Sequence, residues 1–146
     1  MDVCEEELDT LARTIYGEAR GEGMAGMQAI ANVIMNRVAI SERYKNGYWW
    51  GKGVIGVCKK PWQFSCWNKG DVNKAKIENI DFDGDFVFAI ALDIAEQALL
   101  GELEDITNGS TSYHADYVTP KWVKDDKPKA TIGRHLFYHL KGTPRL

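Results

Sequence analysis

The chain has 146 residues, of which 45% are hydrophobic and 27% are charged. This length suits one domain with a substantial core, and this composition excludes wholesale disorder. The net charge of −3 argues against a nucleic-acid footprint over the whole chain. No apolar run approaches the roughly 20 residues that a membrane-spanning helix needs.

Apolar residues recur at helical spacing in two stretches of the N-terminal third. The first stretch predicts a helix over 5–20, which follows a run of acidic residues and ends near Gly21 and Gly23. The second predicts a helix over 24–44. The apolar positions are Leu8, Leu11, Ala12, Ile15 and Ala19 in the first and Met27, Ile30, Ala31, Ile34 and Val38 in the second.

The remaining elements are shorter. Residues 45–80 lack a sustained period and are rich in glycine, which predicts a long loop with one short helix. A third apolar stripe predicts a helix over 85–101 that Gly101 closes. Strand-forming residues over 110–123 predict a small hairpin or an irregular strand pair, and 130–140 adds a last short strand.

Glu18 is the most informative position. It follows Leu11 and Ile15 at helical spacing, so it falls on the core-facing side of the first helix. It also lies in the last turn, where the helix dipole disfavours a carboxylate. Both effects favour the protonated acid that a leaving-group oxygen requires in general acid catalysis. The alternative is a structural ion pair with Arg20 or Arg37.

Glu22 is the second acid in the same glycine-rich string. It is either a partner carboxylate for Glu18 or a residue that caps or charges the N-terminus of the second helix. The distinction matters because ordinary glycoside hydrolysis uses two carboxylates. The glycines on both sides of Glu22 favour the capping interpretation.

The segment 61–68 places three aromatic residues beside amide and hydroxyl side chains. Flat faces next to hydrogen-bonding groups suit sugar rings. Alternatively the aromatic residues plug the core beneath a long loop, and we expect Phe64 to do so. Four more aromatic residues upstream either line the same groove or pack in the core: Tyr44, Tyr48, Trp49 and Trp50.

Residues 79–84 match the first half of a calcium-binding EF-hand loop. The match then fails, because Ile90 stands where a bidentate glutamate belongs. The better interpretation is that Asp83 or Asp85 caps the helix that follows.

His135 and His139 have the spacing of zinc ligands on a helix, but the residues between them favour a strand and a structural or surface role. Three cysteines are too few for a disulfide framework. Cys58 and Cys66 pair only if the chain meets an oxidising compartment. The sequence therefore predicts neither a metal nor an organic cofactor.

Charge is uneven along the chain. Nine acidic residues and no lysine or arginine lie in 78–105, whereas seven basic residues lie in 121–145. These are either solvated faces of opposite sign or segments that draw the protein toward an anionic surface.

Five strings occur in the order that they take in the SleB-type cell-wall hydrolases, the family of the spore cortex-lytic enzymes. The chain resembles the catalytic domain of this family over nearly its whole length, and residues 1–146 are expected to form one catalytic domain. The matching strings are 11–22, 29–38, 63–65, 109–113 and 132–138.

The resemblance implies an α+β, mainly α fold similar to lysozyme and the lytic transglycosylases, with a small β-hairpin beside the cleft. It implies cleavage of peptidoglycan between N-acetylmuramic acid and N-acetylglucosamine, with Glu18 as the catalytic acid. Members of the transglycosylase type need one acid, which protonates the bridging oxygen and then acts as base while the muramic 6-hydroxyl closes an anhydro ring. The substrate-binding residues expected from the match are Gln63, Phe64, Ser65, Tyr113 and Tyr138.

The sequence departs from the family pattern in one string. The family often carries a histidine before the tyrosine of 109–113, where Ser112 stands here, and His114 follows that tyrosine instead. The role of this segment is therefore open.

The first residues are acidic and show no secretory signal. With no separate wall-binding domain, the expectation is a bacteriophage lysin, made in the cytoplasm, that reaches the wall through a holin-made lesion. The expected partner is the peptidoglycan glycan strand, with no nucleic acid and no stable membrane insertion, and the protein is expected to be a monomer.

Three alternatives stay open. The enzyme is either a transglycosylase or a hydrolytic muramidase with a second carboxylate. A binding module that holds glycan strands without cutting them is the second alternative. A binder of anionic surfaces or nucleic acid through the basic tail is the third, and it would lose affinity steeply with salt.

Overall fold

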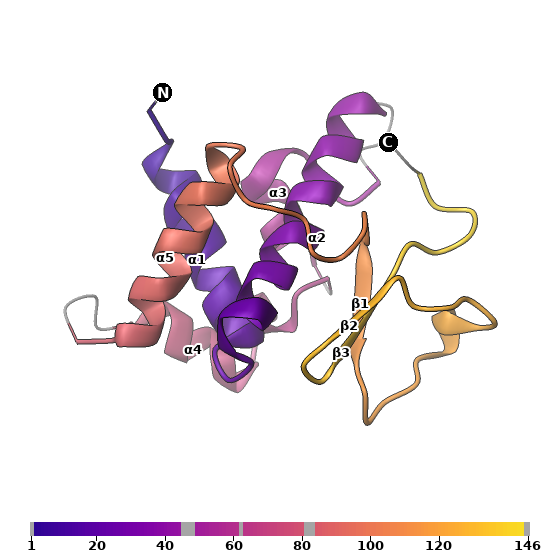
Figure 1. Ribbon diagram of the computed structural model, residues 1–146. Coiled ribbons are helices and arrows are strands. Elements are labelled where there is room, and N and C mark those ends of the chain that lie inside the picture. Colours follow the sequence, from indigo (N-terminus) through magenta and orange to yellow (C-terminus); the bar gives the residue numbers. More distant parts are fainter. Residues whose placement is uncertain (1, 45–48, 62, 81–83, 145–146) are drawn as a thin grey trace.

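The structure is a computed structural model, and it describes residues 2–44, 49–61, 63–80 and 84–144. The described residues form a helical part and a small sheet beside it (Figure 1). The α-helices are α1 (Glu5–Ala19), α2 (Gly23–Arg43), α3 (Gly53–Lys59), α4 (Val72–Glu78) and α5 (Phe86–Leu99). The strands are β1 (Ser112–Ala115), β2 (Ala130–Ile132) and β3 (His135–Tyr138), and two 3-10 turns are η1 (Ser65–Trp67) and η2 (Lys121–Val123).

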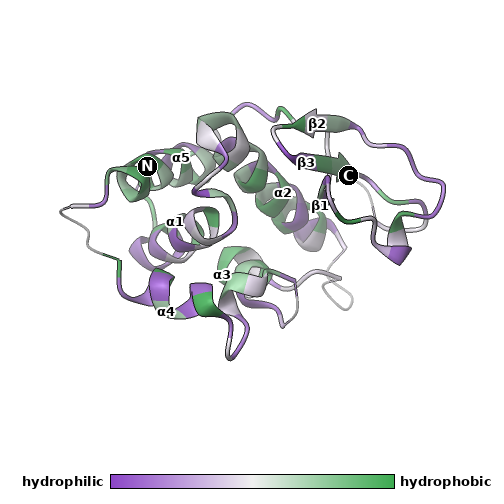
Figure 2. Ribbon diagram, turned by 90° about the horizontal axis from the view of Figure 1, so that it is seen from below, coloured by the Kyte–Doolittle hydropathy of each residue, from purple (hydrophilic) through white to green (hydrophobic). Residues whose placement is uncertain are grey.

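Helix α1 is the centre of the helical part, because it contacts α2, α3, α4 and α5. Its inner face, which includes Leu11 and Ile15, is fully buried. Burial of one such side chain stabilises the fold by roughly 1.5–3 kcal/mol. In Figure 2 hydrophobic ribbon segments of α1, α2 and α5 lie toward one another, as the apolar spacing predicts.

Both predicted N-terminal helices are confirmed to within one residue at each end. Three glutamates occupy the first turn of α1, where they complement the helix dipole. Gly23, the first residue of α2, has a φ of +77°, a conformation that residues other than glycine rarely adopt. The local sequence therefore determines where α1 ends and α2 begins.

The prediction of one short helix within 45–80 was wrong. The described part of this segment contains α3, η1 and α4, all of which contact α1. Helix α3 is anchored by buried Val57, and the N-cap of α4 is Asp71, whose side chain accepts a hydrogen bond from the backbone N–H of Asn73. Seven-residue helices are too short to show a sustained apolar period, so tertiary packing rather than pattern defines them.

Helix α5 was predicted correctly, one residue longer at its start and two at its end than observed. Asp85 is its N-cap and accepts a hydrogen bond of 3.0 Å from the backbone N–H of Phe88. Asp81 and Asp83 of the calcium-like pattern lie outside the described residues. The observed role of Asp85 is the capping role that the sequence favoured over calcium.

The sheet has the order β1-β3-β2 with antiparallel pairing throughout. Tyr113 of β1 and Ala130 of β2 both pair with Phe137 of the central strand. The predicted hairpin within 110–123 is therefore wrong, because that segment holds one strand and the turn η2. The hairpin lies instead within the predicted last strand, where β2 and β3 are joined through Gly133.

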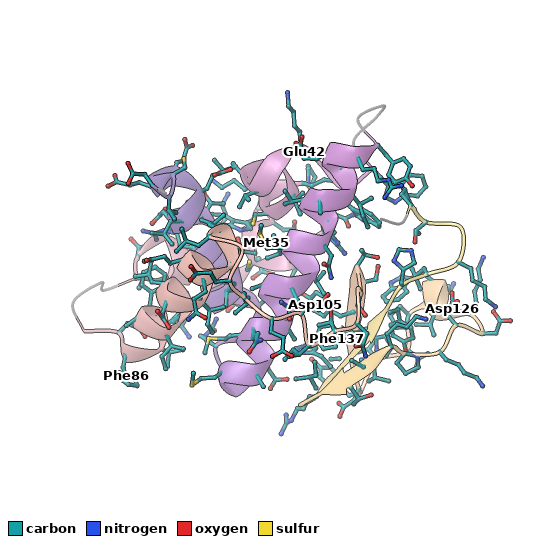
Figure 3. All side chains as sticks on the ribbon, turned by 45° about the horizontal axis from the view of Figure 1, so that its top comes forward. Met35, Glu42, Phe86, Asp105, Asp126 and Phe137 are labelled. Atoms are coloured by element: carbon teal, nitrogen blue, oxygen red, sulfur yellow. The ribbon has the colours of Figure 1, made fainter. Side chains whose placement is uncertain are left out.

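The sheet is joined to the helices through its central strand and the segment before β1. Phe137 is fully buried and belongs to the main core (Figure 3). Asn32 of α2 accepts from the backbone N–H of Ile106 and donates to the carbonyl of Glu104, and Asn36 donates to the carbonyl of Ser110. These bonds hold the incoming chain on α2 and thereby place β1 opposite the end of α1.

None of the described helices combines the length and the apolar character that crossing a bilayer requires.

Candidate active site

Glu18 lies at the C-terminal end of α1, between two cavities that it lines on both sides. The first cavity has a volume of about 500 Å³ and the second about 350 Å³. The side chain is half-buried. A carboxyl group in this position faces open space in two directions while its helix is fixed in the core.

Tyr113 of β1 reaches across from the sheet and forms a hydrogen bond with the carboxyl group of Glu18 on α1. Its Oη donates a hydrogen bond of 2.5 Å to Oε1 of Glu18. Burial, with the nearby Glu18 charge, raises the pKa of Tyr113 well above its ordinary value. Tyr113 is therefore a neutral hydrogen-bond donor at neutral pH.

The second oxygen of Glu18 is less strongly engaged. The backbone N–H of Cys66 in η1 points at Oε2 over 3.4 Å, which is a long contact. Oε1 thus has the strong partner and Oε2 has room for another. This asymmetry leaves one oxygen of the carboxyl group available to a ligand in the cleft.

Gly17 explains why η1 lies so close to α1. A Cβ at this position would lie 2.8 Å from Cβ of Cys66, 2.9 Å from its Sγ and 3.0 Å from a methyl of Ile77. Any larger residue would push the turn away from the helix. The glycine before Glu18 therefore allows the backbone of Cys66 to reach the carboxyl group.

Cys58 and Cys66 are both free and buried, so the structure does not contain the disulfide left open by the sequence. Burial raises the pKa of the Cys58 thiol to about 12. Burial also raises the pKa of the Cys66 thiol, to which Glu18 adds. Both side chains are neutral packing groups rather than thiolate nucleophiles.

Arg37 is a buried cation beneath the first cavity, which it helps to line. It donates a hydrogen bond of 2.7 Å to the carbonyl of Thr111 and a longer one of 3.4 Å to Oε1 of Gln63. Its guanidinium lies over the rings of Phe64 and Trp50. Burial lowers the pKa of Arg37 to about 10, so it is still charged at neutral pH.

The predicted ion-pair alternative for Glu18 is wrong. Neither Arg20 nor Arg37 forms a salt bridge with it, and the ion pairs found among the described residues join other groups. The hydrogen-bond partners of Glu18 are Tyr113 and Cys66 instead. The spacing of the sequence predicted that the arginines lie near Glu18, but it could not show that their side chains bond to Asn73 and to the carbonyl of Thr111.

Three of the predicted substrate-binding residues line the first cavity: Gln63, Ser65 and Tyr113. The wall is completed by residues that the sequence did not single out as site residues, namely Arg37, Ser112, Trp122 and Leu140. Ser112 and Trp122 come from β1 and η2, and an aromatic ring next to hydroxyl and amide groups is suited to a sugar. The strand-forming pattern predicted β-structure over 110–123, but it did not predict that the side chains of Ser112 and Trp122 line the cavity.

Phe64 and Tyr138 do not line either cavity. Phe64 is 1% exposed and plugs the core, the role that the sequence favoured for it. Tyr138 is 3% exposed, and its Oη lies 2.9 Å from Nε2 of His114. Its ring packs edge-on against Trp122, so Tyr138 supports a cavity wall from behind.

The second cavity is lined by charged and polar groups from α1, its following turn, α4 and the β2–β3 hairpin. Glu22 stands at the N-cap of α2 but its side chain makes no capping hydrogen bond. Its Oε1 lies instead 3.4 Å from Nδ1 of His135. The lining residues are Gly17, Glu18, Arg20, Gly21, Glu22, Asn73, Ala115, Tyr117, Arg134 and His135.

The other predicted candidates lie away from Glu18. Trp49 is largely exposed, and Trp50 is buried beneath Arg37. Tyr48 and Trp62 lie outside the described residues. His139 contacts Thr111 and Thr143, and within the described ranges no group of histidine, cysteine, aspartate and glutamate side chains has the arrangement of a metal site.

The family described as Cell Wall Hydrolase matches residues 21–138. The chain belongs to the Cell Wall Hydrolase family. This confirms the resemblance found in the sequence and the prediction of an enzyme rather than a binding module. The matched range begins just after Glu18, so the assignment of that residue depends on the geometry above.

Similarity to curated relatives extends over nearly the whole of this chain. The chain is 28% identical over 136 residues to a "Spore cortex-lytic enzyme" of Halalkalibacterium halodurans, covering 91% of this chain and 34% of the relative. It is also 28% identical over 136 residues to a "Spore cortex-lytic enzyme" of Bacillus cereus, covering 91% of this chain and 44% of that one. The chain thus spans less than half the length of these relatives.

Two solved structures have the same fold. The catalytic domain of the Bacillus cereus SleB protein matches with a TM-score of 0.68 at 27% identity, covering 93% of this chain and 91% of that one. The catalytic domain of a germination-specific lytic transglycosylase SleB from Bacillus anthracis matches with a TM-score of 0.66 at 26% identity, covering 92% and 95%. The predicted mainly helical fold with a small sheet is therefore confirmed.

Proposed function

We propose that this cell wall hydrolase cuts the glycan strands of peptidoglycan between N-acetylmuramic acid and N-acetylglucosamine, with Glu18 as the catalytic acid. The observation that carries the proposal is the place of Glu18 between two cavities. An enzyme that cuts within a polymer needs space for a sugar on each side of the bond, and the acid must reach the oxygen between them.

The contacts of Glu18 fit a general acid. Oε2, whose hydrogen bond from the described part of the chain is the long contact from Cys66, gives its proton to the bridging oxygen as the bond to the muramic C1 breaks. The carboxylate that remains is stabilised by the hydrogen bond from Tyr113 and by the N–H of Cys66. These donors are in place before the reaction, so no reorganisation is needed as the negative charge forms.

A lytic transglycosylase completes the reaction with the same residue. The Glu18 carboxylate takes the proton of the muramic 6-hydroxyl while that oxygen bonds to C1. The product is a 1,6-anhydro ring, and Glu18 is protonated again for the next cycle. This route requires a single well-placed acid, and the similarity to the Bacillus anthracis lytic transglycosylase supports it.

Hydrolysis by a muramidase is the second candidate function. Glu22 lines the second cavity together with Glu18, so a second carboxylate faces the same space. Hydrolytic enzymes use such a carboxylate to activate water or to bond to the sugar. Glu22 also contacts His135, so its presence in the cavity has a structural explanation. We therefore favour the transglycosylase, which needs no second carboxylate.

The decisive experiment is mass spectrometry of the products that the enzyme releases from purified peptidoglycan, with Glu18→Gln as the matched variant. Anhydromuramic ends from the wild type alone support a transglycosylase with Glu18 as its acid. Reducing muramic ends support the muramidase, and Glu22→Gln then becomes the next variant. Equal release by the wild type and Glu18→Gln would remove Glu18 from the mechanism.

The phage-lysin origin and delivery to the wall through a membrane lesion stay predictions. They are tested by locating the protein in host cells before and after the membrane is permeabilised. Export in intact cells would contradict them.

A further inference from the structure

The second cavity has a charge pattern that acid catalysis does not explain. Two guanidinium groups line it, Arg20 from the end of α1 and Arg134 from the β2–β3 hairpin. The first cavity has one arginine, Arg37, which is buried and already bonded to protein oxygens. The two sides of Glu18 are therefore chemically unlike.

Arg20 is held in place without a salt bridge among the described residues, although it is close enough to the Asp85 carboxylate to help lower the pKa of that group. Its Nη2 donates a hydrogen bond of 2.8 Å to Oδ1 of Asn73, and its guanidinium lies over the ring of Tyr16. The hydroxyl of Tyr16 in turn donates to Asp85 over 2.6 Å. No carboxylate in the described part of the chain lies within salt-bridge distance of Arg20.

Arg134 presents an exposed side chain from a fixed turn. Its backbone carbonyl accepts a hydrogen bond of 2.7 Å from the N–H of Asp116, which ties the turn to the end of β1. Gly133 before it has a φ of +56°, so the turn has a defined shape. Among the described residues none forms an ion pair with its guanidinium.

The two acids of the same cavity, Glu18 and Glu22, form no salt bridge with either of these cations. Glu18 is bonded to Tyr113, and Glu22 lies 3.4 Å from Nδ1 of His135. That nitrogen is buried and has no hydrogen-bond partner among the described residues. The two arginines therefore line the cavity without a salt bridge to any carboxylate in the described part of the chain.

We infer that the second cavity binds a carboxylate appended to the muramic sugar, and that this contact places the muramic residue on the Arg20 side of Glu18. The inference rests on the proposed function and extends it from the site of cleavage to the direction of the strand. A planar guanidinium binds a carboxylate through two parallel hydrogen bonds, and Arg20 is already oriented by Asn73 and Tyr16.

The carboxylate has two possible sources in peptidoglycan. One is the lactyl group of a muramic residue without a peptide, and the other is the stem peptide that is attached there. N-acetylglucosamine has neither. Recognition of the carboxylate thus distinguishes the two alternating sugars and selects one of the two directions in which a strand can lie across Glu18.

The experiment measures binding of purified glycan strands to Glu18→Gln, which removes turnover, by isothermal titration calorimetry. The ligands are peptide-free strands with lactyl carboxylates, peptide-bearing strands, and both after conversion of their carboxylates to methylamides. We expect methylamidation to weaken binding about tenfold for each arginine that loses its bidentate contact. The strand type that shows the loss identifies the source of the carboxylate.

Arg20→Gln and Arg134→Gln, each added to Glu18→Gln, are the test variants, and Arg43→Gln is the matched control. Arg43 lies in the last turn of α2, over the ring of Tyr44 and outside both cavities. We expect each test variant to lose about tenfold of the preference and the variant with both arginines replaced to bind the two ligand forms alike, while the control keeps the full preference. Thermal unfolding shows whether each variant is folded.

Equal affinity of Glu18→Gln for carboxylate and methylamide strands would overturn the inference, as would undetectable binding of every strand. So would loss of the preference in Arg43→Gln to the same extent. The proposed function fails by a different observation, namely no release of sugar products by the wild type. A preference for carboxylate strands without release would preserve the binding site and reject the reaction.

Discussion

The two walls of the cleft are built in different ways. The helical wall supplies Glu18 from α1, a helix whose inner face is fully buried and which contacts the four other α-helices. The β wall supplies Tyr113, Ser112 and Arg134 from strands and turns that are only partly buried. The proposed acid is thus on the most extensively packed helix, and the groups proposed to orient it and to bind the substrate are on shorter, less buried elements.

Loss of the acid on the helical wall is expected to have the largest effect. Glu18→Gln keeps the shape of the side chain but has no transferable proton. We expect the rate of product release to fall by about 10³-fold, within the range found for general acids. The melting temperature should change little. Retention of more than a tenth of the wild-type rate would show that the acid lies elsewhere.

The close approach of η1 to the helical wall is tested next. Gly17→Ala places a methyl group 2.8 Å from Cβ of Cys66, so the turn must move. We expect a loss of about 1–3 kcal/mol in the free energy of unfolding, as in other overpacked sites, together with reduced activity.

Gly21→Ala is the matched control for that variant. A Cβ at Gly21 meets no atom within 4 Å, so stability should be nearly unchanged. Urea unfolding of the two variants compares them directly. Equal stability would show that the tight packing around Gly17 is not required.

The β wall is tested through the hydrogen bond to Glu18. Tyr113→Phe removes the donor to Oε1 and leaves the ring packed against Phe137 and Phe64. We expect kcat to fall by about 10- to 100-fold, the value of one charge-assisted hydrogen bond of roughly 1.5–3 kcal/mol. KM should change less than kcat.

Tyr44→Phe is the control for that variant. Tyr44 is 44% exposed and lines neither cavity. The loss of its hydroxyl should leave kcat within a factor of about two. If the two variants behaved alike, the contact between Tyr113 and Glu18 would have no special role.

The smallest effect is expected where the two walls are joined. Burial raises the pKa of Asp105, but hydrogen bonds from Thr107, Asn36 and Gly109 more than offset it and leave the pKa below its ordinary value. A carboxyl group with a depressed pKa in the folded state stabilises the fold above its unfolded pKa. That contribution is lost as the pH falls through the folded value.

Asp105→Asn should therefore reduce stability near neutral pH by about 1 kcal/mol and make little difference in acid. Asp116→Asn is the control, since its side chain has no hydrogen bond in the described structure. Unfolding free energies at several pH values measure both. A pH-independent difference would exclude the carboxylate of Asp105 as its cause.

The helical wall was predictable because its signals are local. Apolar spacing and flanking glycines located α1 and α2 to within one residue, and the face of α1 that carries Leu11 and Ile15 also identified Glu18. Asp85 was recognised as a cap because an N-cap bonds within its own helix turn.

The β wall was predicted less well because its contacts are distant in sequence. The pattern of 110–123 marked a β region, but the partner of β1 is β3, not a neighbouring strand. No local signal indicates such a pairing. Local sequence also gives no sign that Trp122 and Leu140 line the first cavity, because the tertiary fold places them there.

The sequence by itself determined the core helices, the acid on the inner face of α1 and the family of the chain, because helix period and short motifs are properties of adjacent residues. Tertiary structure alone decided what surrounds that acid. It placed Tyr113 and Cys66 on the two oxygens of Glu18 and buried Arg37. It also left Arg20 and Arg134 without a salt bridge among the described residues. These contacts join residues far apart in the chain, and only the packing of the sheet against α1 and α2 brings them together.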